Sequence, residues 1–163
     1  MSESIHADYI FNSPLETAIR SLCVLVVDDT LHFDLQQLLA FDHLVVHSGD
    51  LNESLASLHP KVLQRNGELL VRRSIVEKGL LLMESKNLVE RYVTRDGFHY
   101  SATELAVVFV ESLTNPYVSE LYLRSKWAVQ MHRESGDQLF TEVFKTAFDR
   151  WSREFQIAEL PLR

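Results

Sequence analysis

The chain has 163 residues, of which 46% are apolar, and it carries 16 basic and 23 acidic side chains for a net charge of −7. This apolar content suffices for the core of one domain, and the excess of acid excludes strong DNA binding by charge alone, because such binding comes from Lys and Arg displacing counterions at phosphates. The longest apolar run of the first predicted helix, Leu22 to Val27, is far shorter than the roughly twenty residues of a membrane span.

The N-terminal region predicts two helices. Ser13-Pro14-Leu15-Glu16 combines an N-cap serine, proline at the first helical position and an acidic residue in the first turn, and apolar residues follow at helical spacing up to Asp28. Asp34 is expected to cap a second helix that runs to about His47, before Gly49. Residues 50–66 lack clear periodicity, which indicates a functional loop or short helices.

The middle of the chain predicts a helix, a hairpin and a further helix without a break. The helix is expected from about Glu68 to Lys86. It carries two apolar stripes that predict a helix wedged between neighbours, one of Leu69, Val76, Leu80 and Met83 and one of Val71, Ile75 and Leu82.

The hairpin and the start of the next helix follow from short local patterns. Asp96-Gly97 suits a two-residue turn, which would make Val93 and Tyr100 face each other across two strands. Residues 101–104, Ser-Ala-Thr-Glu, are typical of a capping box and place the next helix start at Ser101.

The C-terminal region predicts two more helices. Asn115-Pro116 should open a helix that reaches about Glu134 and ends at Gly136, and the last helix begins at Asp137. The fold expected is mostly α with a small β-hairpin. We expect a winged helix-turn-helix in residues 1–114 and a C-terminal helical hairpin in residues 115–163, packed on it as one structural unit.

No pattern in the sequence predicts catalysis, a cofactor or a bound metal. His43 and His47 are four residues apart with Asp50 and His59 nearby, but no glutamate lies between the two and no second Cys or His cluster accompanies them. No nucleophile elbow or phosphate-binding loop is present. The single Cys23 lies in an apolar run, which indicates a buried thiol in a reducing compartment, and with no signal-peptide pattern we expect a cytoplasmic protein.

Two surfaces are candidates for binding. An aromatic stripe on the last helix either packs on the preceding helix or forms a docking surface, and its members are Phe140, Phe144, Phe148, Trp151 and Phe155. The long helix and the hairpin offer cations for DNA, namely Arg73, Lys78, Arg91 and Arg95. Glu77 and Glu84 give this face a mixed sign, which argues against DNA reading by the chain alone.

Four phrases of the sequence, in their order and spacing, carry a family resemblance over about residues 14 to 130. They are Ala40-Phe41-Asp42-His43-Leu44-Val45-Val46-His47-Ser48-Gly49-Asp50-Leu51, Ser57-Leu58-His59-Pro60, Gly67-Glu68-Leu69-Leu70-Val71-Arg72-Arg73, and Gly79-Leu80-Leu81-Leu82 leading to Leu88-Val89-Glu90. They resemble the middle-component proteins of ABC-three-component conflict systems, the group that includes Lamassu-type defence operons.

The resemblance implies a non-enzymatic winged-helix subunit between an SMC- or Rad50-like ATPase and an effector, often a nuclease, in anti-phage or anti-plasmid defence. DNA would then be held mainly by the ATPase. His47, His59, Arg72 and Arg73 match the family's pattern, without a role that the resemblance assigns. On physical grounds we expect Arg72 and Arg73 to bridge carboxylates within the fold or on a partner. The alternative function is a stand-alone winged-helix transcription regulator, which would bind DNA by itself.

Overall fold

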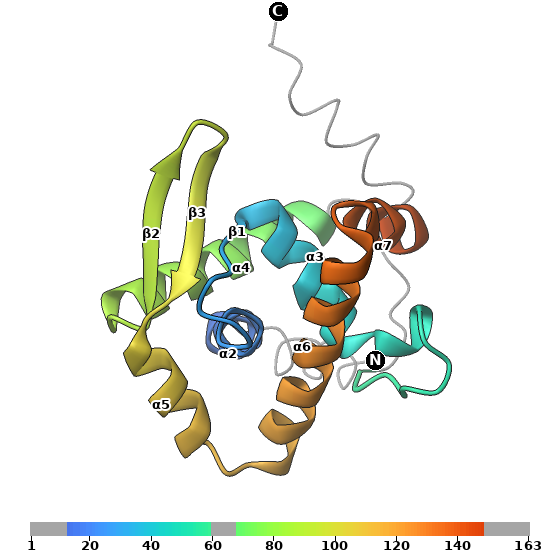
Figure 1. Ribbon diagram of the computed structural model, residues 1–163, viewed down its shortest axis with the longest axis horizontal. Helices are drawn as coiled ribbons and strands as arrows, with labels where there is room; N and C mark the ends of the chain where they lie inside the picture. The colour runs from blue at the N-terminus through green and yellow to red at the C-terminus, as the bar shows by residue number, and fades with distance from the viewer. Residues whose placement is uncertain (1–12, 60–67, 149–163) are drawn as a thin grey trace, which may run out of the picture.

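The computed structural model describes residues 13–59 and 68–148, which are mostly helical with a small three-stranded antiparallel sheet (Figure 1). The elements in chain order are α2 (Pro14–Leu25), β1 (Phe33–Asp34), α3 (Leu35–Val46), the 3-10 turn η1 (Ser48–Asp50), α4 (Glu68–Ser85), β2 (Val89–Thr94), β3 (Gly97–Ala102), α5 (Glu104–Ser112), α6 (Pro116–Ser135) and α7 (Gln138–Phe148). None of the helices in these two ranges has the length and hydropathy that a membrane crossing requires.

The predicted helix starts at Ser13, Asp34 and Asn115 are confirmed by their capping bonds. The Ser13 hydroxyl accepts from the Glu16 amide at 3.3 Å, and the Asn115 side chain accepts from the Tyr117 amide at 2.8 Å. Asp34 forms a reciprocal capping box with Gln37, with bonds of 2.7 and 3.0 Å. These caps satisfy amides that have no partner within their own helix.

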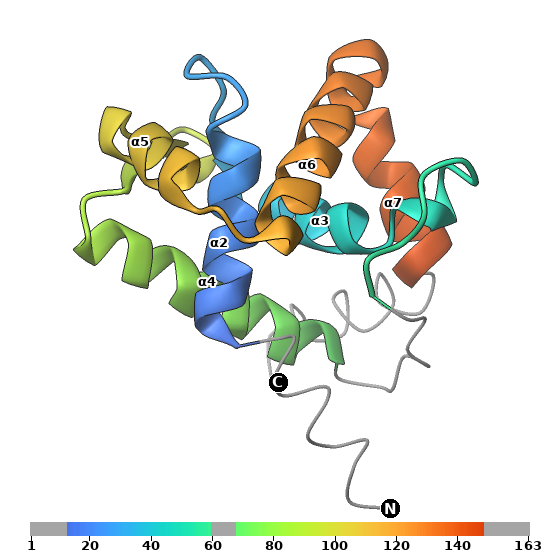
Figure 2. The ribbon, with the colours of Figure 1, turned by 90° about the horizontal axis from the view of Figure 1, so that it is seen from below.

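Helix α2 lies at the centre of the fold, between α4 on one side and α3 and α6 on the other (Figure 2). Ala18, Leu22 and Cys23 on α2 have no exposed surface. Helix α4 crosses α2 at Gly79, where an added Cβ would lie only 2.7 Å from the Pro14 carbonyl oxygen. The glycine therefore sets the close approach of the two helices.

Helix α4 is wedged between neighbours as predicted, since it contacts α2 and α3, but its second apolar stripe is only partly covered: Ile75 and Leu82 are half-buried. The side chain of Leu69, in the first stripe, lies outside the described residues. Val76, Leu80 and Met83 are buried against the neighbouring helices, as expected for the first. Val71, by contrast, is 60% exposed. The reason is that α4 meets α2 and α3, while its opposite side faces solvent.

The strands are ordered β1-β3-β2, and the predicted hairpin register is wrong. Val93 pairs with Phe98, and Tyr100 pairs with Arg91 rather than with Val93. The turn lies one residue earlier than expected, with Gly97 at φ +115° just after it. Thr94 fixes this turn, because its hydroxyl accepts from the Asp96 amide and donates to the Gly97 carbonyl, each at 3.1 Å.

Helix α5 begins later than the predicted capping box. Its N-cap is Thr103, and Ser101 and Ala102 are still part of β3, which pairs with β2 up to Val89. The Thr103 hydroxyl accepts from the Ala106 amide at 3.3 Å and donates to the Asn87 carbonyl at 2.8 Å. Thr103 thus caps α5 and ties it to the end of α4.

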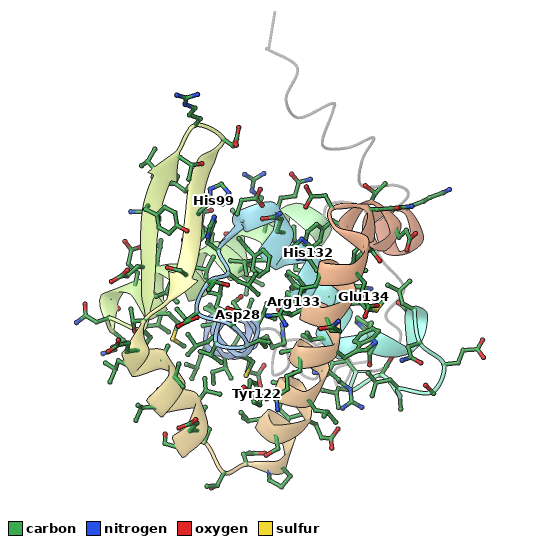
Figure 3. The ribbon with its side chains drawn as sticks, viewed as in Figure 1. Asp28, His99, Tyr122, His132, Arg133 and Glu134 are labelled. Atoms are coloured by element: carbon green, nitrogen blue, oxygen red, sulfur yellow. The ribbon has the colours of Figure 1, made fainter. Side chains whose placement is uncertain are left out.

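The two C-terminal helices begin close to their predicted starts, at Pro116 and Gln138, and both pack on this core. Helix α6 lies against α2 and α3, and α7 lies against α3 and α6. An ion pair between Arg133 of α6 and Asp28, beyond the end of α2, joins the far ends of these two helices (Figure 3).

Candidate functional site

The most developed polar feature of the described chain is a buried network that joins α2, α3, α4, α6 and the loop after α3. Its members are Thr17, Arg20, Asp42, His43, His47, Asp50, His59, Arg72 and Tyr117. We call this set the polar network. It contains three of the four residues that match the family pattern, His47, His59 and Arg72.

The centre of the polar network is an ion pair between Arg20 of α2 and Asp42 of α3. The guanidinium Nε lies 2.6 Å from Asp42 Oδ1, and each residue is only 1% exposed. Arg20 Nη2 also donates to the Thr17 hydroxyl at 3.1 Å. Each of these buried charges compensates the other, and removing either one would leave the other charge buried without a partner, which strongly destabilises the folded state.

The histidines extend the network from this pair to the loop and to α4. His43 and His47 stack with ring centroids 4.6 Å apart, and His43 Nε2 lies 3.3 Å from Asp50 Oδ2. Arg72 Nη1 donates to His43 Nδ1 at 3.5 Å. Within the described residues Arg72 therefore contacts an imidazole, and its expected bridging of carboxylates on a partner stays a prediction.

His59 and Tyr117 close the other side of the network. His59 Nε2 lies 2.5 Å from the Tyr117 hydroxyl, and the two rings stack with centroids 6.0 Å apart. Burial raises the pKa of the Tyr117 phenol, while the nearby Arg20 guanidinium acts to lower it. A neutral His59 imidazole can accept from the phenol or donate to it, and in either tautomer both groups have a partner.

The three histidines are held neutral. Burial, followed by the neighbouring His47 and Arg72, lowers the pKa of His43 from 6.5 to about 2. Burial, with Arg20 next, lowers the pKa of His59 to about 4, and burial also lowers the pKa of His47. Two cationic guanidiniums and little water leave no favourable place for a further positive charge.

The polar network stabilises the fold by cross-linking its helices through hydrogen bonds and an ion pair. Within residues 13–59 and 68–148, no three His, Cys, Asp or Glu side chains are placed to hold a metal ion. Burial raises the pKa of the Cys23 thiol to about 12, so this sulfur is a poor nucleophile. The network fixes the positions of four helices and the loop.

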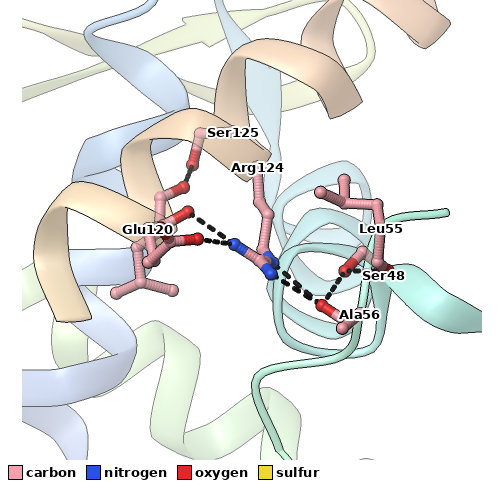
Figure 4. Close-up of polar contacts among 7 residues, drawn as sticks. Ser48, Leu55, Ala56, Glu120, Arg124 and Ser125 are labelled. Carbon is pink, nitrogen blue, oxygen red and sulfur yellow. Dashed lines mark hydrogen bonds and ion pairs between the residues drawn. The ribbon is translucent and has the colours of Figure 1, made fainter. Parts of the chain in front are cut away.

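A second tie holds the loop after α3 against α6 (Figure 4). Arg124 donates through Nε and Nη2 to the Ala56 carbonyl, at 3.2 and 2.7 Å, and forms an ion pair with Glu120. On the loop side, the Ser48 hydroxyl donates to the Leu55 and Ala56 carbonyls at 3.2 and 3.1 Å. Residues 48–59 are therefore an ordered part of the fold.

The cations proposed for DNA contact lie on different elements. Arg73 is half-buried and Lys78 is exposed on α4, while Arg95 is exposed in the turn between β2 and β3. Arg91 lies 3.5 Å from Glu84 and places its guanidinium 4.8 Å from the Phe98 ring centroid. Its charge is thus balanced within the chain.

The aromatic stripe of the last helix is described only in its first turn. Phe140 is 7% exposed and packs against Phe41 and His132, with ring centroids 5.2 and 4.9 Å away. It belongs to the core. The side chains of Phe144 and Phe148, and all of Trp151 and Phe155, lie outside the described residues.

Exposed apolar side chains gather on two other parts of the molecule. At the hairpin, Val93 is 75% exposed and its cross-strand partner Phe98 is 51% exposed. On α5, Leu105 is 54% and Val108 is 62% exposed. The periodicity of apolar residues in these two segments does not predict that these side chains are exposed.

Comparison with known protein families identifies the chain. The sequence profile of the ABC-three component (ABC-3C) system Middle Component 2 family matches residues 10–154. This chain belongs to the Middle Component 2 family. Searches of curated proteins and of solved structures gave no match.

The family match places this Middle Component 2 chain among the components of an ABC-3C system, as an accessory component of a defence system. The matched range includes the polar network and both exposed apolar parts. Sequence reasoning missed the Arg20–Asp42 pair and the Arg124 tie. Their only sequence signal is a charged residue within an otherwise apolar helical face, as Arg20 is between Ile19 and Leu22.

Proposed function

We propose that this chain is a non-enzymatic subunit that bridges an SMC- or Rad50-like ABC ATPase and a nuclease-type effector in anti-phage or anti-plasmid defence. Membership of the Middle Component 2 family carries the proposal. In this arrangement, which resembles Lamassu-type systems, the ATPase holds the DNA and the middle component holds its protein partners in the cytoplasm. The chain needs no cofactor for this role.

The order of elements supports a winged-helix fold for residues 1–114. A helix, a short strand, two helices and a hairpin follow one another as α2, β1, α3, α4 and β2–β3, and β1 pairs with the far strand of the hairpin. In this interpretation α4 is the second helix of the helix-turn-helix and the β2–β3 hairpin is the wing. In the proposed second part, residues 115–163, helices α6 and α7 extend the same structural unit.

The wing is proposed as one protein-binding surface. It projects from the helical body (Figure 1), and the pair Val93 and Phe98 presents apolar side chains that are 75% and 51% exposed. Exposed aromatic and aliphatic pairs of this kind are typical of protein interfaces. Arg73 on α4 and the aromatic residues Phe144, Phe148, Trp151 and Phe155, whose side chains lie outside the described residues, stay proposed as further interface residues.

A transcription regulator that binds DNA through Arg73, Lys78, Arg91 and Arg95 has less support. A reading helix needs several cations on one face that are free to meet phosphates and bases. Arg91 is balanced by Glu84. On α4 the exposed Lys78 lies beside the exposed Glu77, and the exposed side of the helix also carries Val71 and Leu81, which are 60% and 48% exposed.

Co-purification tests the proposal. The chain is produced with the ABC ATPase of its system, analysed by size exclusion and mass photometry, and separately titrated with duplex DNA at low and moderate salt. We expect a stable complex with the ATPase and no salt-sensitive DNA binding by the chain alone. A lone protein that binds DNA tightly and releases it as salt rises would favour the regulator.

The wing variants sharpen this test. Val93→Asp should weaken the complex with the ATPase or with the effector, because it places a charge in an apolar contact. Glu90→Ala, on an exposed position of the same strand, is the matched control and should bind as the wild type does. Equal binding by all three proteins would remove the wing from the proposed interface.

A further inference from the structure

Helix α5 is apolar on almost every side, yet only Ala106 and Val110 are buried within the described chain. Leu105, Val107 and Val108 remain 54%, 37% and 62% exposed. A helix that is apolar all round normally lies in an interior. The α5 helix contacts α2 and β3 on its inner side, and its outer side is covered by nothing in residues 13–59 and 68–148.

A groove of about 510 Å³ runs beside α5, between this helix, the end of α4 and the start of α2. Its lining consists of Leu15, Leu82, Met83, Lys86, Leu88, Leu105, Val108, Phe109 and Ser112. All but Lys86 and Ser112 are apolar. Leu105 and Val108, three residues apart on α5, form a ridge along one side of the groove.

We infer that a second copy of this chain fills the groove, and that each copy lays its own α5 ridge in the groove of the other. A two-fold interface uses the same patch on both subunits, so the patch must be complementary to itself. A ridge directly beside a groove meets that condition, because the rotation brings each ridge over the opposite groove. Leu105 and Val108 would then pack on Leu15, Leu82 and Leu88 of the other copy.

The charged residues at the edge of the groove are consistent with a second copy of the chain as its occupant. Lys86 has no ion pair within the described chain, and neither have Glu104 and Glu111, which lie exposed on α5 at either end of the ridge. A second copy therefore brings carboxylates together with its apolar ridge to a groove in which Lys86 is the one cation among the described lining residues. Rim charges of this kind fix the register of an interface more than its affinity.

This dimer is independent of the proposed bridging function, since it uses α5 and the groove rather than the wing. The test is the mass of the full chain alone, by light scattering and sedimentation equilibrium from micromolar to near-millimolar concentration. We expect a dimer. Leu105→Ser combined with Val108→Ser should raise its dissociation constant by about tenfold or more, because both exposed side chains leave the contact.

The control is Leu123→Ser on α6, which removes an apolar side chain of equal exposure, 53%, away from the groove. It should leave the dimer unchanged, and circular dichroism checks that every variant is folded. Lys86→Glu should weaken the dimer, and Glu104→Lys with Glu111→Lys in the same chain should restore it.

A monomer at all concentrations would overturn the inference. So would a dimer that Leu105→Ser and Val108→Ser leave intact, or one that Leu123→Ser weakens equally. A chain that remains monomeric but loses ATPase binding when Leu105 and Val108 are changed would also overturn it, and would assign the groove to the ATPase.

Discussion

Replacing Gly79 by alanine should destabilise the protein, although helix propensity predicts the opposite. Within an ordinary helix, alanine is more favourable than glycine by roughly 1 kcal/mol. At this position the new Cβ would lie 2.7 Å from the Pro14 carbonyl oxygen, 3.0 Å from the Ala18 amide nitrogen and 3.1 Å from the Ala18 Cβ. Two of these three atoms are backbone atoms of α2, so no side-chain rotation relieves the contact.

The two helices must therefore move apart, which loosens the packing of Val76 and Leu80 on α2. Overpacking of a core costs about 1 to 3 kcal/mol, and here it exceeds the gain in propensity. Because the nearest atoms belong to the α2 backbone and cannot rotate away, we expect the upper part of this range, about 2 to 3 kcal/mol. After the propensity gain of roughly 1 kcal/mol, the net loss in the free energy of unfolding is about 1 to 2 kcal/mol.

Urea unfolding of the full chain, followed by circular dichroism, measures this loss. The matched control is Lys78→Ala, on the adjacent exposed position of α4, which should change the free energy of unfolding by less than about 0.5 kcal/mol. A Gly79→Ala protein as stable as the wild type, or more stable, would refute the close crossing of α2 and α4.

Three further predictions concern the buried groups. Asp42→Ala should cost about 3 to 5 kcal/mol in the free energy of unfolding, because it leaves the Arg20 charge buried without its carboxylate; an unfolding midpoint close to that of the wild type would contradict this. The pKa values of His43 and His59 are lowered from 6.5 to about 2 and about 4, so the unfolded chain binds protons that the folded chain does not. Stability should therefore be complete above pH 6.5 and should fall toward pH 4, by up to about 1.4 kcal/mol per histidine and pH unit, in urea titrations at several pH values. Cys23, fully buried with its pKa raised to about 12, should react with a thiol reagent at pH 8 only after unfolding, and rapid labelling of the native protein would place it at the surface.

The helices were predictable because their starts are encoded by short local patterns. Ser13, Asp34 and Asn115 each cap the helix that follows within three residues, so the capping bond and its sequence signal coincide. The burial of Cys23 followed in the same way from one continuous apolar run. Such features need no knowledge of the tertiary structure.

The errors occur where a local pattern allowed two outcomes. Asp96-Gly97 suits a two-residue turn, but the Thr94 hydroxyl caps the turn one residue earlier and moves the register. Thr103 rather than Ser101 caps α5, because β3 continues through Ala102. In both cases a threonine hydroxyl decided between two positions that sequence patterns rank almost equally.

The candidate site was the least predictable part, because its contacts join distant residues. Arg20 and Asp42 are 22 residues apart, and Arg124 binds the Ala56 carbonyl across 68 residues. No local periodicity encodes either distance. The exposed groove beside α5 was also hidden, since an apolar helix gives the same sequence pattern whether the chain itself or another subunit covers it.

The bridging role is tested most directly by reconstituting the three components of the system. The ATPase and the effector are mixed with and without this chain, and the masses of the complexes are measured by mass photometry. The account predicts that the ATPase and the effector associate only when this chain is present. Association of the two without it, or binding of the chain to neither, would contradict the account.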